Sequence, residues 1–260
     1  MTTLTLPRRP FVEFSGVRFR LWPVLLAAVL MQGVLWPARE LARWIAHREA
    51  DFFNAHVWAF VGLAMVLQTL AGLACIAVMR RVLPQAPTYL RWPTRGQGLV
   101  GPGFAIGVGM ALTMLVADYW PQLISHTAPN GGYDTSPLGA VGWLAVMASS
   151  GLCEETIFRG LLVGMLTVLV PGRVRAGRFE IPFSGLVVAL LFGLAHYTSF
   201  LVDPFWMAFA QQLYAFVFGL IYVWLVERSR SLLAPMIAHG VGDALEVAAV
   251  MWLQVAWAVH

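Results

Sequence analysis

Long apolar stretches separated by short polar gaps run along most of the chain. A helix needs ~20 mostly apolar residues to cross the hydrocarbon core of a bilayer, and most of these stretches reach about that length. The predicted spans are residues 21–37, 57–79, 99–120, 138–170, 183–200, 205–226 and 232–259. The fourth and the last are long enough to be tilted, broken or extended beyond the membrane. The pattern therefore predicts an all-α fold, a polytopic transmembrane helical bundle of about seven or eight spans.

The polar gaps alternate between basic and Arg-free ones. Arginines cluster in residues 80–95, 173–178 and 228–230, whereas residues 126–134 and 199–203 contain neither Arg nor Lys. The positive-inside rule places the basic gaps in the cytoplasm. The segment that follows the first span interrupts this alternation with mixed charges and an apolar face, which predicts an amphipathic helix at the membrane interface.

Composition agrees with a membrane protein that has the lipid bilayer as its partner. The chain is 59% hydrophobic and 12% charged, with a mean hydropathy of +0.73, whereas soluble domains are typically ~25% charged. The chain has no Lys, so its net charge of +4 reflects Arg alone. Most of these Arg lie in the polar gaps, which indicates topology and no nucleic-acid partner. Abundant Arg, Ala, Gly and Trp without Lys are typical of a high-GC bacterial gene, and thus favour the bacterial inner (cytoplasmic) membrane.

Ionisable side chains well inside the apolar spans are confined to the C-terminal half. Each costs ~2.5–3.5 kcal/mol at the centre of a spanning helix, so each calls for an explanation. They are Glu154, Glu155, Arg159, His196, His239, Asp243 and Glu246. Their concentration predicts one polar cavity. It also divides the chain into N-terminal transmembrane helices with the interfacial segment, residues 1–137, and a catalytic transmembrane core, residues 138–260.

Helical spacing predicts which of these side chains share a face. Glu155 and Arg159 are four residues apart and can pair. Glu154 is rotated by about 100° from its neighbour, at ~3.6 residues per turn, so it is free to face a cavity while Glu155 is occupied by Arg159. His239 and Asp243 are again four residues apart and share a face.

Four of the side chains together supply what peptide-bond hydrolysis needs. A buried carboxylate such as Glu154 can activate water as a base and then protonate the leaving amine as an acid. Imidazoles such as those of His196 and His239 can hold the developing oxyanion. With Asp243, the set contains every required part.

Structural interpretations stand beside the catalytic one. A single histidine inside a membrane is about as often a hydrogen-bonded packing residue. The Glu155–Arg159 pair is expected mainly to position its surroundings. Glu246 either lines the same cavity or lies near an interface, and the structural interpretation is favoured for it. Asp118 and His56 lie at the ends of predicted spans, where we expect them to be solvated.

Three short motifs resemble those of one membrane protease family. Residues 154–159 read EETIFR, residues 192–196 read FGLAH and residues 239–243 read HGVGD. In the same order they resemble the EExxxR, FxxxH and Hxxx(N/D) motifs of the CAAX prenyl endopeptidase and bacteriocin-processing (CPBP, or Abi) family. The resemblance covers the chain from the fourth predicted span to the last, and the N-terminal half carries no recognisable motif.

The resemblance implies a function for each motif residue. It implies about eight spans around a conical cavity that opens to the membrane and the cytosol. Glu154 would activate water with the help of His196, and His239 with Asp243 would form an oxyanion site. Glu155 and Arg159 would support this arrangement. Many members carry Asn where this chain has Asp243, and an Asp can donate a hydrogen bond to an oxyanion only when it is protonated.

Family members have been described both as metalloproteases and as metal-free glutamic proteases. Glu154, His196 and His239 are alternative zinc ligands, since zinc is bound by imidazoles and carboxylates. The chain lacks the HExxH pattern of many zinc proteases. The metal-free interpretation, without a cofactor, is therefore favoured.

The expected substrate is a membrane protein or peptide. Eukaryotic members cut prenylated CaaX proteins, but no prenyl-binding site is identifiable in this chain. A bacterial member would more plausibly trim membrane-inserted peptides, sorting signals or bacteriocin leaders.

Other functions remain as alternatives. Residues 240–243 read GVGD, the GxGD pattern of aspartyl intramembrane proteases, which needs a second Asp, with Asp118 and Asp203 as candidates. A rhomboid-like serine protease would use Ser150, although Ala148 replaces the usual glycine of GxSG. A transporter, or a non-proteolytic scaffold or immunity protein, would use the same polar residues without cutting.

Overall fold

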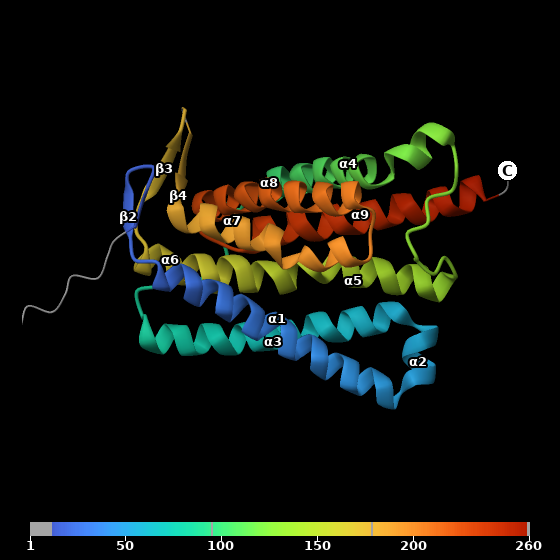
Figure 1. The fold of residues 1–260 in the computed structure, drawn as a ribbon, viewed down its shortest axis with the longest axis horizontal. Coiled ribbons are helices and arrows are strands. Elements are labelled where there is room, and N and C mark those ends of the chain that lie inside the picture. The colour runs from blue at the N-terminus through green and yellow to red at the C-terminus, as the bar shows by residue number, and fades with distance from the viewer. Residues whose placement is uncertain (1–11, 95, 178, 259–260) are drawn as a thin grey trace, which may run out of the picture.

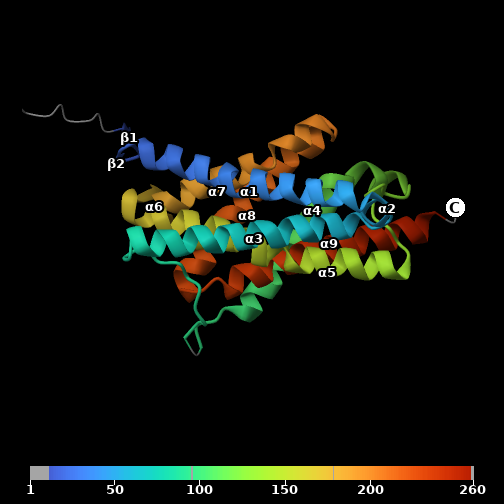
Figure 2. The same ribbon diagram turned by 90° about the horizontal axis from the view of Figure 1, so that it is seen from below.

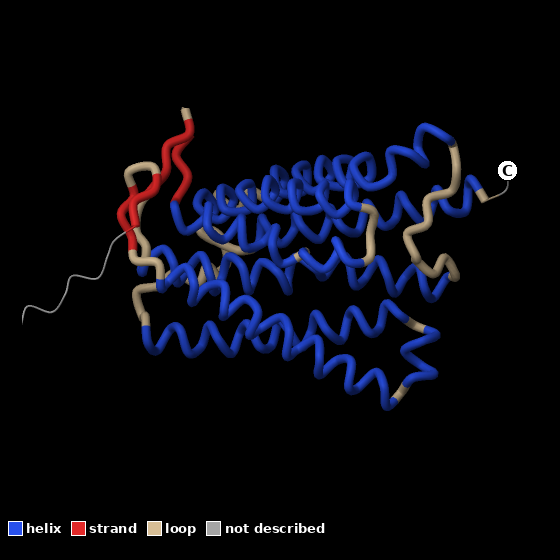
Figure 3. The backbone as a smooth tube through the Cα atoms, viewed as in Figure 1, coloured by secondary structure: helices blue, strands red, loops and turns tan. Residues whose placement is uncertain are grey.

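The computed structural model describes residues 12–94, 96–177 and 179–258. Helices make up most of this part of the chain, and two short antiparallel hairpins complete it (Figures 1 and 3). In chain order the elements are β1 (Val12–Phe14), β2 (Val17–Phe19), α1 (Trp22–Arg48), α2 (Ala50–Ala55), α3 (Val57–Val82), α4 (Val100–Ser125), α5 (Pro137–Glu155), η1 (Thr156–Val163), α6 (Gly164–Leu169), β3 (Arg173–Ala176), β4 (Phe179–Pro182), α7 (Phe183–Ala195), η2 (Tyr197–Leu201), α8 (Phe205–Ser229) and α9 (Leu233–Trp257).

The helices confirm an all-α, multi-pass membrane protein. Six helices in the described part of the chain are long and apolar enough to cross a membrane, namely α1, α3, α4, α7 with η2, α8 and α9. A seventh rod is formed by α5, η1 and α6, because the backbone stays right-handed helical at both junctions. Its middle section, η1, is π-helical, a form that is rare and often occurs at functional sites.

Two segments differ from the prediction. The expected interfacial helix is helical but continues α1 through Pro37 to Arg48, and the short helix α2 follows it. Neighbouring helices can support a proline inside a spanning helix, so Pro37 does not end α1. Helix α4 likewise continues past Pro121 to Ser125, with a kink at Tyr119.

Turn chemistry fixes the start of the long α5–η1–α6 rod. The Ser136 hydroxyl accepts a hydrogen bond from the Gly139 N–H at 3.2 Å, as an N-cap does. Asp134 accepts hydrogen bonds from both the N–H and the hydroxyl of Ser136, each at 2.9 Å, and these lower the pKa of the Asp134 carboxyl. The rod therefore begins at a defined residue, and its register places residues 154–159 near its middle.

Helix α9 packs against α5 through backbone contacts at glycines. A Cβ atom added to Gly151 would lie 2.3 Å from the Met236 carbonyl oxygen, and one added to Gly240 would lie 2.3 Å from that of Ala148. Two glycines of α4 approach α9 almost as closely. Small residues at helix contacts are typical of membrane bundles, where close packing stabilises helix association. The close contacts hold α9 in the position from which it supplies one side of the cavity.

The two ends of the bundle differ in charge. Both hairpins lie at the end where α1 begins, whereas α2 and the last described residues of α9 lie at the other (Figures 1 and 2). At the hairpin end, Arg173 pairs with Glu227 at 2.7 Å and Arg91 donates to the Arg230 carbonyl at 2.8 Å. We call this the basic end. The opposite end holds the α4–α5 loop and the α7–α8 turn, two of the Arg-free gaps. It also holds the last part of α1 and the start of α2, where Arg39, Arg43 and Arg48 are accompanied by Glu40, Glu49 and Asp51. Because it has fewer Arg than the basic end, we call it the Arg-poor end.

Candidate active site

A buried ion pair inside the α5–η1–α6 rod forms the base of the site. Glu155 and Arg159 have no exposed side-chain surface, and the Arg159 Nη1 donates to Glu155 Oε1 at 2.9 Å. The other terminal nitrogen of Arg159 donates to the Gly219 carbonyl of α8 at 3.0 Å. The guanidinium also lies over the rings of Phe192, 4.6 Å from its centroid, and Tyr222, 5.0 Å from its centroid. The guanidinium thus joins the rod to α7 and α8.

His239 of α9 lies directly on this pair. Its Nδ1 is 3.0 Å from Glu155 Oε1, and its ring stacks on Tyr222 with centroids 5.2 Å apart. A carboxylate beside Nδ1 fixes the proton on that nitrogen and turns Nε2 the other way. The His239 Nε2 then points to Glu154, with 3.7 Å to Oε2, and to Asp243, with 3.5 Å to Oδ2.

Neighbouring carboxyls of α5 therefore have different surroundings. Glu155 is fully buried between Arg159 and His239, whereas the Glu154 side chain keeps 24% of its surface exposed and reaches the cavity. Glu154 Oε2 has no hydrogen-bond partner among the described residues. Helical spacing predicted that Glu155 pairs with Arg159 while Glu154 faces a cavity. The contact between Glu155 and His239 was not predicted.

His196 lies where α7 ends, at the junction with η2. Its Nδ1 is 2.9 Å from the Phe192 carbonyl oxygen, one turn earlier. Because a carbonyl only accepts, this contact places the proton on Nδ1 and leaves Nε2 of a neutral ring as an acceptor. The Phe192 ring lies edge-on to both His196 and His239, with centroids 5.4 Å and 5.7 Å away.

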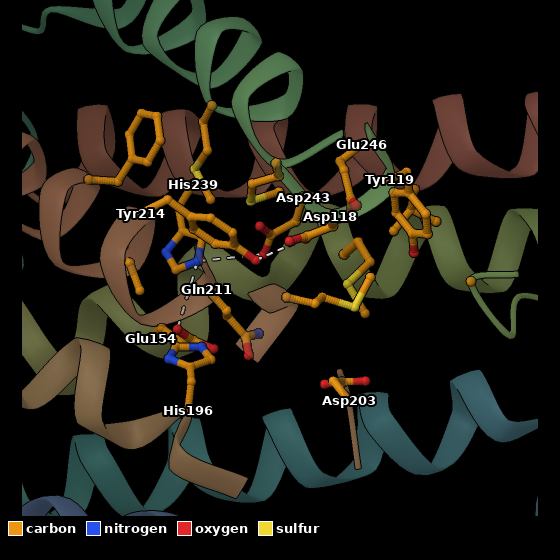
Figure 4. Close-up of a pocket in the computed structure, with 18 of the residues that line it drawn as sticks. Asp118, Tyr119, Glu154, His196, Asp203, Gln211, Tyr214, His239, Asp243 and Glu246 are labelled. Carbon is orange, nitrogen blue, oxygen red and sulfur yellow. Dashed lines mark hydrogen bonds and ion pairs between the residues drawn. The ribbon is translucent and has the colours of Figure 1, made fainter. Parts of the chain in front are cut away.

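A single cavity of about 370 Å³ brings these groups together (Figure 4). Its lining includes Glu154, His196, His239 and Asp243, while Glu155 and Arg159 lie behind His239. Helix α4, helix α8 and the α4–α5 loop complete the wall. The polar or aromatic residues that they add are Asp118, Tyr119, Asn130, Tyr133, Gln211, Tyr214 and Phe218, and Asp203 and Glu246 also line the cavity.

Residues 136–245 match a family model described as type II CAAX prenyl endopeptidase Rce1-like. The matched range runs from the N-cap of α5 into α9, and so contains all three motifs, including the ion pair within the first. The motif-bearing part of the chain is thus similar to this family. No curated protein and no solved structure matches the chain. The family match supports the suspected CPBP membership and a CAAX-protease-like endopeptidase.

The cavity also contains carboxyls for which no catalytic role was expected. Asp118 was expected to be solvated, but only 8% of it is exposed and it accepts a hydrogen bond from the Tyr214 hydroxyl at 3.1 Å. That expectation was wrong because Asp118 faces α8 and the cavity, although α4 kinks at the next residue, Tyr119. Glu246 is also 8% exposed and lines the cavity, although the structural interpretation was favoured for it. His56 is partly buried between α2 and α3, away from the residues that line the cavity.

The cavity extends toward the Arg-poor end. Its lining includes Asn130, Gly131 and Tyr133 of the α4–α5 loop, and Asp203 after η2. The family resemblance implied a cavity open to the cytosol, whereas the positive-inside rule puts these Arg-free loops on the other side of the membrane. The two expectations disagree, and an experiment on the membrane topology would separate them.

The zinc alternative requires several ligating side chains to converge on one point. Among the described residues, no three His, Cys, Asp or Glu side chains are grouped so that they could hold a metal ion. Glu154, His196 and His239 share the cavity, but His239 uses its Nδ1 on Glu155 and its Nε2 lies between two carboxylates. As placed here, the three do not form a zinc site of the kind that binds zinc at ~2.0–2.2 Å.

Proposed function

We propose that this chain is an intramembrane endopeptidase in which Glu154 activates a water molecule to cut a peptide bond of a membrane-associated protein or peptide. One observation carries the proposal: Glu154 and the Nε2 of His239 face each other across one cavity, 3.7 Å apart, while a buried ion pair fixes His239 from behind. A base and an oxyanion donor are thus provided from two separate helices.

The reaction follows from these positions. Glu154 accepts a proton from water while the water oxygen attacks the scissile carbonyl carbon, and the acceptor Nε2 of His196 helps to orient the water. The carbonyl oxygen becomes an oxyanion, which accepts a hydrogen bond from the Nε2–H of protonated His239. The C–N bond then breaks, and the Glu154 carboxylic acid returns its proton to the leaving amine.

Glu155 and Asp243 support the charge on His239. An imidazolium there would donate from Nδ1 to Glu155 and lies 3.5 Å from the Asp243 carboxylate through Nε2. We infer that Asp243 stabilises this imidazolium and positions it. The role differs from the direct oxyanion contact that the resemblance implied, and it does not require Asp243 to be protonated.

The substrate class and the location belong to the same proposal. A membrane-inserted peptide, a sorting signal or a leader peptide in a bacterial inner membrane suits an enzyme with its polar groups inside the bundle. The prenylated CaaX proteins in the name of the matched family are the alternative substrate.

An aspartyl protease is the second candidate, because Asp118, Asp203 and Asp243 line the same cavity. The sequence alone had left Asp243 without a convincing partner. Aspartyl catalysis needs two carboxyls that share one proton, so it makes Asp243 indispensable and Glu154 dispensable.

Cleavage of a membrane peptide by detergent-purified protein tests both candidates. Glu154→Gln should lower the rate by ~10²–10⁴-fold, the usual contribution of a general base, and His239→Gln should lower it comparably. Asp243→Asn should retain measurable activity, because Asn occupies this position in many relatives. Glu227→Gln makes the same chemical change at the basic end and serves as the matched control.

Two results would contradict the glutamate mechanism. Full activity in Glu154→Gln with complete loss in Asp243→Asn would indicate the aspartyl mechanism. Loss of wild-type activity with a chelator, restored by zinc, would indicate a metal-dependent one.

A further inference from the structure

We propose that the outer part of the cavity binds a basic side chain, Lys or Arg, of the substrate. This outer part is defined by Asp118, Asp203 and Glu246, and we call it the acidic vestibule (Figure 4). The proposal rests on the proposed function, because the vestibule and the catalytic groups line one cavity.

The charges that line the cavity are unbalanced. Five carboxyls line it, counting Glu154 and Asp243 with the three of the vestibule, but no Arg is among its described lining residues. The buried cations nearby are already engaged. Arg159 pairs with Glu155, and His239 lies between Glu155, Glu154 and Asp243. The vestibule thus lacks a cation from the described part of the chain.

Two carboxyls of the vestibule lack full partners although they are nine-tenths buried. Glu246 has no hydrogen bond or ion pair with any described residue, and it is 8% exposed. Asp118 Oδ2 accepts from Tyr214, but its buried Oδ1 has no partner among the described residues. Buried charges are normally paired, because removing a carboxylate from water without a partner is costly. A cation brought by the substrate would satisfy both groups.

The surroundings suit an organic cation better than an inorganic one. No three acidic or other ligating side chains among the described residues are grouped tightly enough for a metal ion. The aromatic rings of Tyr119, Tyr133 and Tyr214 line the same region. Ammonium and guanidinium groups bind over aromatic faces as well as to carboxylates. An extended Lys or Arg side chain therefore fits this combination of carboxylates and rings.

The spacing along α9 sets how far the basic residue lies from the bond that is cut. Glu246 follows His239 by seven residues, about two turns on the same face, which is ~10.5 Å at ~1.5 Å per residue. An extended peptide rises ~3.3 Å per residue. The basic side chain should therefore lie about three residues from the scissile bond.

A binding measurement on the Glu154→Gln protein tests the vestibule independently of cleavage. The probes are two fluorescent apolar peptides that are identical except for one Arg or its neutral isostere citrulline. The Arg peptide should bind about tenfold more tightly, the gain expected of one well-placed charge pair, in fluorescence anisotropy. The added substitutions Asp118→Asn and Glu246→Gln together should remove the preference, whereas Glu246→Asp should keep most of it. Glu227→Gln, at the basic end, should leave it unchanged.

Equal binding of the two peptides, or a preference that survives the Asp118→Asn/Glu246→Gln change in a folded protein, would overturn the proposal. The proposal would also be overturned if the two peptides bound equally and Mg²⁺ stabilised the protein in a way that Glu246→Gln removes. The site would then bind an inorganic cation. The results distinguish failure of this proposal from failure of the proposed function. If the protein prefers the Arg peptide but cuts neither peptide, only the proposed hydrolysis is contradicted. If it cuts both peptides but binds them with equal affinity, only the vestibule is contradicted.

Discussion

At the scale of single residues, Glu155 joins two of the motifs. One of its oxygens meets both the Arg159 guanidinium and the His239 ring, at 2.9 Å and 3.0 Å. The first and third motifs are therefore joined by a direct contact between side chains 84 positions apart. Loss of either charged partner should affect folding as well as the orientation of His239.

Arg159→Met should destabilise the protein strongly. The change leaves Glu155 buried without its cation, and breaking a buried pair on one side costs about 3–5 kcal/mol. Glu155→Gln/Arg159→Met removes both charges and should recover much of the stability but not the activity, since the contact to His239 is weakened. Thermal unfolding in detergent, followed by tryptophan fluorescence, measures the first effect. Equal stability of Arg159→Met and wild type would contradict this view of the pair.

Local patterns predicted part of this site. The i, i+4 spacing was enough to pair Glu155 with Arg159 and to turn Glu154 toward a cavity. Asp118 was misjudged because the end of a predicted span was taken to be solvated. Helix α4 does kink at Tyr119, but Asp118 is buried against α8. Its partner Tyr214 is 96 positions away. Such a contact depends on how α4 and α8 pack, and the hydrophobic periodicity of a single helix does not reveal its packing partner.

At the scale of elements, the α5–α9 contact determines whether the cavity forms. The two helices carry Glu154 and His239, and they approach so closely that only glycine fits at Gly151 and Gly240. The hydrophobic pattern predicted both helices, but not their contact, because a lipid-facing and a helix-facing apolar residue look alike in sequence.

Gly240→Ala should therefore reduce both stability and activity. The new Cβ would lie 2.3 Å from the Ala148 carbonyl oxygen, and overpacking typically costs ~1–3 kcal/mol. Gly109→Ala in α4 is the matched control, since nothing lies within 4 Å of a Cβ there. Thermal unfolding and peptide cleavage should both separate the two variants. A Gly240→Ala protein as stable and active as Gly109→Ala would show that the helices can separate at no cost.

At the scale of the whole molecule, charge divides the bundle into two ends. Arg91, Arg173 and Arg230 take part in contacts at the basic end, whereas the two loops that border the cavity are free of Arg and the arginines near α2 are accompanied by acidic residues. The positive-inside rule then places the cavity end outside the cytoplasm, opposite to the direction that the family resemblance implied.

Labelling with a membrane-impermeant maleimide in intact cells determines this orientation. In a Cys75→Ser background, with Cys153 buried, a cysteine from Thr135→Cys at the Arg-poor end should be labelled in intact cells. One from Arg175→Cys at the basic end should be labelled only after lysis. The reverse pattern would place the cavity on the cytosolic side and would show that the Arg-rich loops are exported.

The narrow catalytic site also restricts the form in which a substrate can enter. A helix with its side chains is ~10–12 Å across, whereas Glu154 Oε2 and His239 Nε2 are only 3.7 Å apart, so an intact helix cannot pass between them. Helix α9 is fixed by its glycine contacts and cannot move aside without breaking them. A spanning segment must therefore unwind before it reaches Glu154, and sequences that already resist helix formation, such as those with Gly or Pro near the cut, should be preferred.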